Sequence, residues 1–201
     1  MNRPGIAALG LLLGLLTAPA PAQDPLAEDR ERWAEVGEVT VFRVRPPMDW
    51  HLREEEYLGF ELSFPCEPQR EVISEPRHGL VRYSCAHAGH GYLALLGRHH
   101  EPEAFDPELF HAGTDLGLMQ QLRAEGEALE VDALAHVNYY GLVGRQVEMR
   151  SQRLRIRKRT LTRGGLTVQL QVSSRWPNPG TPDSAEAFFN ALRVVEPAAA
   201  Q

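Results

Sequence analysis

The chain has 201 residues, with 21 Lys and Arg against 27 Asp and Glu, so its formal net charge is −6 at pH 7 with histidine neutral. Nucleic acid and acidic membrane surfaces repel such a chain on average, and neither is expected as a partner. The length suits one domain that buries a substantial apolar core.

Residues 1–22, MNRPGIAALGLLLGLLTAPAPA, have the composition of a secretory signal peptide. Arg3 precedes an apolar run over 6–16, and small residues spaced as Ala-x-Ala follow. A membrane span needs about 20 apolar residues, and prolines interrupt this run before that length. We therefore expect cleavage after Ala22 and a soluble, periplasmic or secreted chain without a transmembrane segment. Loss of Arg3 leaves 20 Lys and Arg against 27 Asp and Glu, a net charge of −7.

The rest of the chain divides by composition. Residues 23–37 are polar and charged, which predicts a linker or a short helix. We expect a single α+β domain over 38–196 and a frayed tail over 197–201. Residues 39–44 predict an edge strand that ends at two prolines. In 57–65, alternate apolar residues share one face of a strand and should lie in the core: Leu58, Phe60, Leu62 and Phe64.

Cys66 and Cys85 are the only cysteines of the chain. Export delivers them to an oxidising compartment, where two thiols tend to pair. We expect a disulfide that joins the ends of two strands, with Pro65 and Pro68 fixing the turn that places Cys66. No Cys-x-x-Cys pair is present, which argues against an oxidoreductase.

The central part predicts a hairpin of residues 70–75 and 80–85, then a strand over 91–98. Asp106 and Pro107 have the order of an N-cap followed by proline at the first helical position, which begins a helix that ends near Gly126. Apolar residues and a glycine recur along it at helical spacing: Leu109, Gly113, Leu116 and Leu122.

The second half is mostly strand. Residues 128–137 and 139–151 predict two strands, and 154–162 and 166–174 flank the turn Arg163-Gly164-Gly165 as a hairpin. A short helix over 185–192 and a last strand over 193–195 close the domain. The order predicts an antiparallel sheet with helices on its faces.

Four segments carry a family resemblance: FELSFPCEP (60–68), GLVGRQVEMR (141–150), RGG (163–165) and SAEAFFNALRVV (184–195). Together they resemble the PsbP-like superfamily, which includes DcrB-like periplasmic proteins, and within it an exported bacterial branch of unassigned function. The resemblance implies an α-β-α sandwich and an accessory or binding role without catalysis. It transfers no functional residue, because the matching positions are packing positions, and Cys66 stands where the family has glycine.

No sequence motif for catalysis is present: no G-x-S-x-G, no H-E-x-x-H and no glycine-rich phosphate loop. We therefore expect a protein that is not an enzyme. A hydrolase whose site is assembled only in space remains a third hypothesis.

Histidines cluster at the two ends of the strand over 91–98. His87 and His90 are the candidate ligands for zinc or copper, with a third ligand needed from elsewhere. His99 and His100 lie at the other end, about 26 Å away at ~3.3 Å per residue, so the two pairs do not share one ion. The alternative is that all of them are solvent-exposed polar residues in turns.

Alternation places four arginines on one face of a strand: Arg153, Arg155, Arg157 and Arg159. Either cross-strand carboxylates such as Glu148 neutralise this stripe, or it docks an anionic or acidic protein partner. Trp176, in a predicted loop, either anchors a partner or closes the end of the domain. The leading hypothesis is an exported accessory protein that binds a protein or anionic partner in the cell envelope, and metal binding at His87 and His90 is the alternative.

Overall fold

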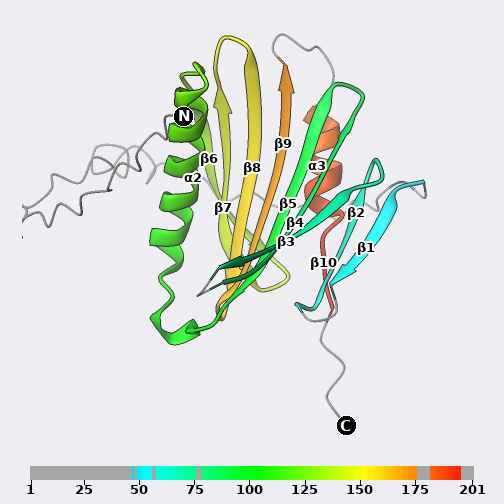
Figure 1. Ribbon diagram of the computed structural model, residues 1–201, viewed down its shortest axis with the longest axis vertical. Coiled ribbons are helices and arrows are strands. Elements are labelled where there is room, and N and C mark those ends of the chain that lie inside the picture. The colour runs from blue at the N-terminus through cyan, green and yellow to red at the C-terminus, as the bar shows by residue number, and fades with distance from the viewer. Residues whose placement is uncertain (1–46, 48, 56–57, 76–77, 176–181, 196–201) are drawn as a thin grey trace, which may run out of the picture. The chain divides into compact units, whose positions relative to one another are not determined.

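The computed structural model describes residues 47, 49–55, 58–75, 78–175 and 182–195 (Figure 1). The expected signal peptide, the linker, the edge strand over 39–44, Trp176 and the C-terminal tail lie outside these residues. Neither described α-helix combines the length and the hydropathy that crossing a bilayer requires.

Seven antiparallel strands form the larger sheet, in the order β3-β4-β5-β9-β8-β7-β6. Their bounds are β3 Gln69–Glu75, β4 His78–His87, β5 His90–His99, β6 Glu130–Tyr139, β7 Leu142–Arg150, β8 Leu154–Arg163 and β9 Leu166–Arg175. The predicted hairpins β3-β4 and β8-β9 are confirmed by their registers, Val72 opposite Val81 and Arg163 opposite Leu166. Gly164 and Gly165 have φ of +53° and +78°, as the two-residue turn between β8 and β9 requires.

A second sheet has three strands in the order β1-β2-β10: β1 His51–Glu55, β2 Phe60–Phe64 and β10 Arg193–Val194. β2 is the predicted core strand, and its Phe60, Leu62 and Phe64 are at most 1% exposed; Leu58, which precedes the strand, is 2% exposed. It does not join the larger sheet. Arg193 of the C-terminal β10 is opposite Glu61 of β2, so the two ends of the described chain pair in the small sheet.

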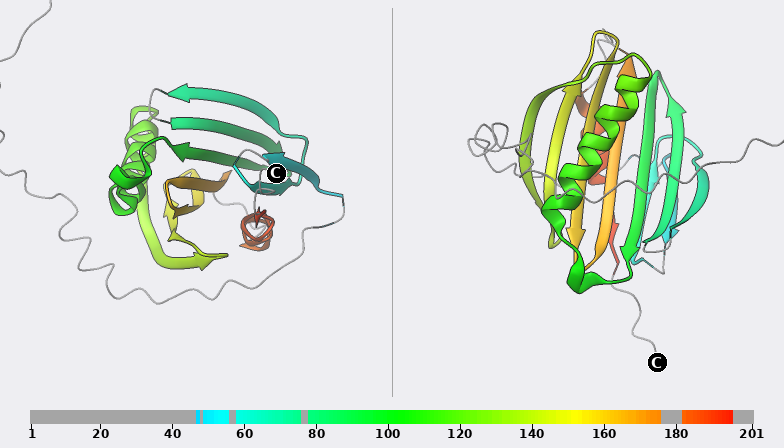
Figure 2. Two further views of the ribbon diagram at one scale, coloured as in Figure 1. Left: turned by 90° about the horizontal axis from the view of Figure 1, so that it is seen from below. Right: turned by 60° about the vertical axis from the view of Figure 1, so that its left-hand side comes forward.

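Two α-helices and one 3₁₀ turn complete the fold: α2 Pro107–Ala124, α3 Pro182–Asn190 and η1 Pro102–Ala104. The predicted N-cap is confirmed, since the Asp106 carboxylate accepts hydrogen bonds from the backbone N–H groups of Glu108 and Leu109. α2 and α3 lie on opposite sides of the larger sheet, and α3 shares its side with the small sheet (Figure 1 and Figure 2).

The predicted α-β-α sandwich is wrong. Strands in two sheets make up most of the described chain, and the described residues form only two α-helices. The physical reason is that the main core lies on one face of the larger sheet, where both β2 and α3 supply the opposing apolar side chains. Phe188 of α3 packs against both sheets, with its ring centroid 5.2 Å from that of Phe64 and 5.3 Å from that of Tyr92.

The predicted disulfide is present. Cys66 follows β2 and Cys85 lies in β4, with their Cα atoms 6.1 Å apart and both residues packed against the core. The bond therefore joins the small sheet to the larger one.

Replacing both cysteines by alanine should lower the free energy of unfolding by about 3 kcal/mol, because the unfolded chain regains the entropy that a loop of this length loses. Denaturant unfolding of the oxidised protein and the variant measures the difference. The matched control is the wild-type protein whose disulfide has been reduced with dithiothreitol, and it should unfold at the same denaturant concentration as the variant. An unchanged midpoint in both would show that the bond adds no stability.

Candidate functional site

The sheet face under α2 mixes buried charged and buried apolar side chains, whereas the other face carries the main apolar core. In β8, Ile156, Lys158 and Thr160 alternate with Arg155, Arg157 and Arg159, so Lys158 is on the α2 side and Arg159 is on the α3 side. The helix matches this face, because its two buried residues are His111 and Asp115. Of the predicted stripe along α2, Leu109 is 71% exposed and Gly113 is exposed, whereas Leu116 and Leu122 are half-buried.

A charge cluster attaches α2 to the sheet. The Asp115 carboxylate pairs with Arg145 of β7 through Oδ2 and accepts a hydrogen bond from Lys158 Nζ at 2.8 Å through Oδ1. Lys158 is fully buried, and burial lowers the pKa of its ammonium group while Asp115 opposes that shift. Buried charges persist only when paired in this way. The cluster fixes the position of the helix along the sheet.

His111 lies one helical turn before Asp115 and is 2% exposed. Its Nε2 has no hydrogen-bond partner among the residues that the structure describes. Burial, with a further contribution from Arg145, lowers the pKa of His111 to about 4. The carboxylates of Glu108 and Asp115 raise this pKa and Lys158 lowers it, but burial is the largest cause. The ring is therefore neutral at pH 7.

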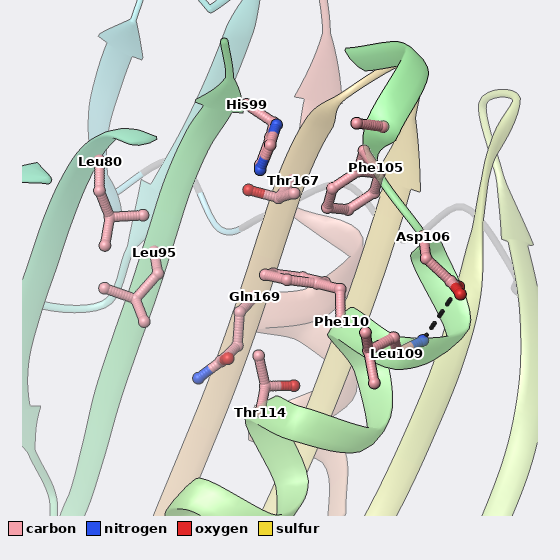
Figure 3. Close-up of a pocket in the computed structure, with 11 residues that line it drawn as sticks. Leu80, Leu95, His99, Phe105, Asp106, Leu109, Phe110, Thr114, Thr167 and Gln169 are labelled. Carbon is pink, nitrogen blue, oxygen red and sulfur yellow. Dashed lines mark hydrogen bonds between the residues drawn. The ribbon is translucent and has the colours of Figure 1, made fainter. Parts of the chain in front are cut away.

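The N-terminal half of α2 forms one wall of an apolar pocket of about 490 Å³. The opposite wall is the sheet, where Leu80 of β4, Leu95 of β5 and Gln169 of β9 point toward the helix (Figure 3). The remaining lining residues come from the end of β5, η1, α2 and β9: His99, Ala104, Phe105, Asp106, Leu109, Phe110, Thr114 and Thr167.

Aromatic contacts hold one end of this pocket. The Phe105 ring centroid lies 5.4 Å from that of His99 and 5.4 Å from that of Phe110. Nδ1 of His99 lies 3.1–3.2 Å from the backbone O and N of Glu101. The size and apolar lining of this pocket are typical of pockets that bind ligands or partner side chains.

The predicted arginine stripe is largely neutralised within the protein. The Glu148 carboxylate accepts from Arg155 at 3.1 Å and from Arg157 at 2.7 Å, so the predicted cross-strand pairing is confirmed. Arg153 precedes β8 and pairs with Glu127 at 2.5 Å. A docking role for the stripe remains a prediction, and Arg153 and Arg155 are its members with the more exposed side chains.

Arg159 is fully buried on the α3 side. It donates from Nε and Nη2 to Gln146 Oε1 at 3.0 and 2.7 Å, and from Nη1 to Asn190 Oδ1 at 3.2 Å. Nη2 lies 3.2 Å from Glu186 Oε2, and the guanidinium carbon lies 4.8 Å from the centroid of the Phe189 ring. Arg159 therefore attaches α3 and contacts no solvent.

The two candidate metal ligands face each other across the hairpin, since His87 of β4 is opposite His90 of β5. His87 is exposed and His90 is 7% exposed. Within the described residues, no group of three histidine, cysteine or acidic side chains is placed to hold a metal ion. His99 lies at the far end of β5, as predicted, and lines the apolar pocket.

Sequence reasoning missed the apolar pocket and the charge cluster. One local signal pointed to the cluster: His111 and Asp115 are four residues apart and therefore share a helix face, and Lys158 shares a strand face with Ile156. No local signal placed Leu80 and Leu95 opposite Phe110.

No family model matches the chain, and no curated protein is similar to it in sequence. The solution structure of cyanobacterial PsbP (CyanoP) from Synechocystis sp. PCC 6803 is similar, with a TM-score of 0.54 at 12% identity over 79% of this chain and 98% of that one. The fold is PsbP-like. PA94, a protein of unknown function from Pseudomonas aeruginosa, aligns with a TM-score of only 0.28 at 12% identity over 62% of this chain and 82% of that one.

Replacing Asp115 by asparagine should destabilise the domain by about 3–5 kcal/mol, because Arg145 and Lys158 then stay buried without their carboxylate. Denaturant unfolding measures this loss. In the control, Asp115→Leu combined with Arg145→Met and Lys158→Met removes all three charges and should keep most of the stability. A single variant as stable as the wild type would contradict the anchoring role of Asp115.

The stability of the domain should fall as the pH decreases from 6.5 to about 4, because the unfolded chain protonates His111 in this range and the folded protein does not. The contribution of His111 to the slope is about 1.4 kcal/mol per pH unit. The free energy of unfolding of His111→Leu, measured over this range, should lack this contribution to its pH slope. The control His136→Gln, which changes an exposed histidine, should keep it. Equal slopes in wild type and His111→Leu would overturn the assignment.

Proposed function

We propose that this chain is an exported, non-catalytic accessory protein that binds a partner at the apolar pocket between α2 and the larger sheet. The observation that carries the proposal is the pocket itself, an apolar space of about 490 Å³ beside a helix that is attached by charges. We assign the chain to the exported bacterial branch of the PsbP-like superfamily that its sequence resembles.

Export is supported by two independent features. The first 22 residues have the composition of a cleavable signal, and the disulfide between Cys66 and Cys85 suits an oxidising compartment. Both features support the proposed periplasmic or secreted location.

Binding without catalysis is supported by the pocket lining. Its titratable side chains are His99 and Asp106, and both have structural partners: the Asp106 carboxylate caps α2, and Nδ1 of His99 contacts the Glu101 backbone. The other lining residues are apolar, hydroxyl or amide side chains, which are suited to recognition. A PsbP-like fold is compatible with an accessory role.

The mature protein should bind the neutral apolar probe N-phenyl-1-naphthylamine with a saturable rise in probe fluorescence. Thr114→Phe places a ring in the pocket and should weaken binding at least tenfold. Gln120→Phe adds the same ring to an exposed position of the same helix and should leave binding unchanged. No saturable binding by the wild type, or equal binding by Thr114→Phe, would reject the pocket as the binding site.

A further inference from the structure

We propose that the occupant of the apolar pocket is a peptide segment of a partner protein in which an apolar anchor side chain is flanked by lysine or arginine. The inference rests on the proposed function and names the chemistry of its partner.

The charge around the pocket supports a basic partner. Four carboxylate residues lie in the stretch that supplies the helix wall, and all are exposed: Glu101, Glu103, Asp106 and Glu108. No lysine or arginine occurs between Arg98 and Arg123, so this wall carries no compensating cation of its own. An acidic rim along one wall of an apolar pocket attracts cations and repels anions.

Nearby cations do not cancel this rim. Arg82 is opposite Leu95 in the β4-β5 register and pairs with Glu71 at 3.5 Å. Arg145 and Lys158 are buried under α2, where both contact Asp115. A partner that approaches from solvent therefore meets the carboxylates of the η1 and α2 segment.

The shape of the apolar surface favours a peptide over an enclosed small molecule. Leu109 lines the pocket and is 71% exposed, so apolar surface continues from the pocket to solvent. A chain that inserts one side chain and lies across the rim covers Leu109 as well. A second copy of this acidic protein, or an acidic membrane, would be repelled by the same carboxylates.

The test uses three fluorescently labelled peptides and the oxidised mature protein. One carries Leu-Phe between pairs of lysines, the second carries Leu-Phe between pairs of glutamates, and the third carries Gly-Ser between lysines. Fluorescence anisotropy should show saturable binding of the first peptide, at least tenfold tighter than of the other two. Binding should weaken as salt rises, because salt screens the exposed charges.

Two triple variants, each of which removes three negative charges, separate the effect of the rim carboxylates from the effect of the net charge of the protein. Replacing Glu101, Glu103 and Glu108 by glutamine should weaken the lysine-flanked apolar peptide about tenfold. The matched control replaces the exposed Glu54, Glu125 and Glu130, which lie away from the pocket, and should change binding less than twofold. Thr114→Phe should abolish binding of the peptide as it does that of the neutral probe.

The outcomes separate this inference from the proposed function. If the neutral probe binds and no peptide does, the pocket stands and the peptide inference is overturned. If the glutamate-flanked peptide binds as tightly as the lysine-flanked Leu-Phe peptide, the proposal of a basic partner is overturned. If the Gly-Ser peptide binds as tightly, binding results from charge attraction alone and does not use the pocket, and the peptide inference is overturned as well. If neither the probe nor a peptide binds, both proposals fall.

Discussion

Two consecutive cations in β8 hold the fold together. Lys158 and Arg159 are both fully buried, and because neighbouring strand residues point to opposite faces, each reaches a different helix. Lys158 meets Asp115 of α2, and Arg159 meets Glu186 and Asn190 of α3. Two neighbouring side chains of β8 therefore attach both helices to the larger sheet. A shift of its register by one residue would exchange the two partners and leave each buried cation opposite the wrong helix.

The two helices depend on these contacts to different degrees. α3 also buries Phe188 and Phe189 in the apolar core, so its attachment combines dispersion and burial with the Arg159 contacts. α2 buries His111 and Asp115 over a face that also buries apolar side chains: Leu134, Val147, Met149 and Ile156. Its attachment therefore combines the Asp115 ion pairs with apolar burial, and the apolar pocket lies beside its N-terminal half.

Local features were predictable from the sequence. The β2 alternation, the Asp106 cap and the Gly164-Gly165 turn are each encoded within a few residues, and the structure has all three. The small sheet was not predictable in this way, because it pairs β2 with β10 from the other end of the described chain. The pocket was not predictable for the same reason, since its walls come from strands and a helix that are not adjacent in sequence.

The arginine stripe shows the limit of periodicity. Alternation placed Arg155, Arg157 and Arg159 correctly on one face, and Glu148 across from them. The alternation does not distinguish a solvated arginine from an arginine buried under a helix, because both occupy every second position of the strand. Burial of Arg159 depends on where α3 packs, and that position follows from Phe188 between the two sheets.

The disulfide between the two sheets also bears on the timing of folding. For a chain exported as proposed, the link is absent in the reducing cytoplasm and forms only after transport. Before that, the small sheet, which pairs strands from both ends of the described chain, lacks its disulfide cross-link to the larger sheet. An exported chain would thus be less stable before transport than after it, because it gains this constraint only at its destination.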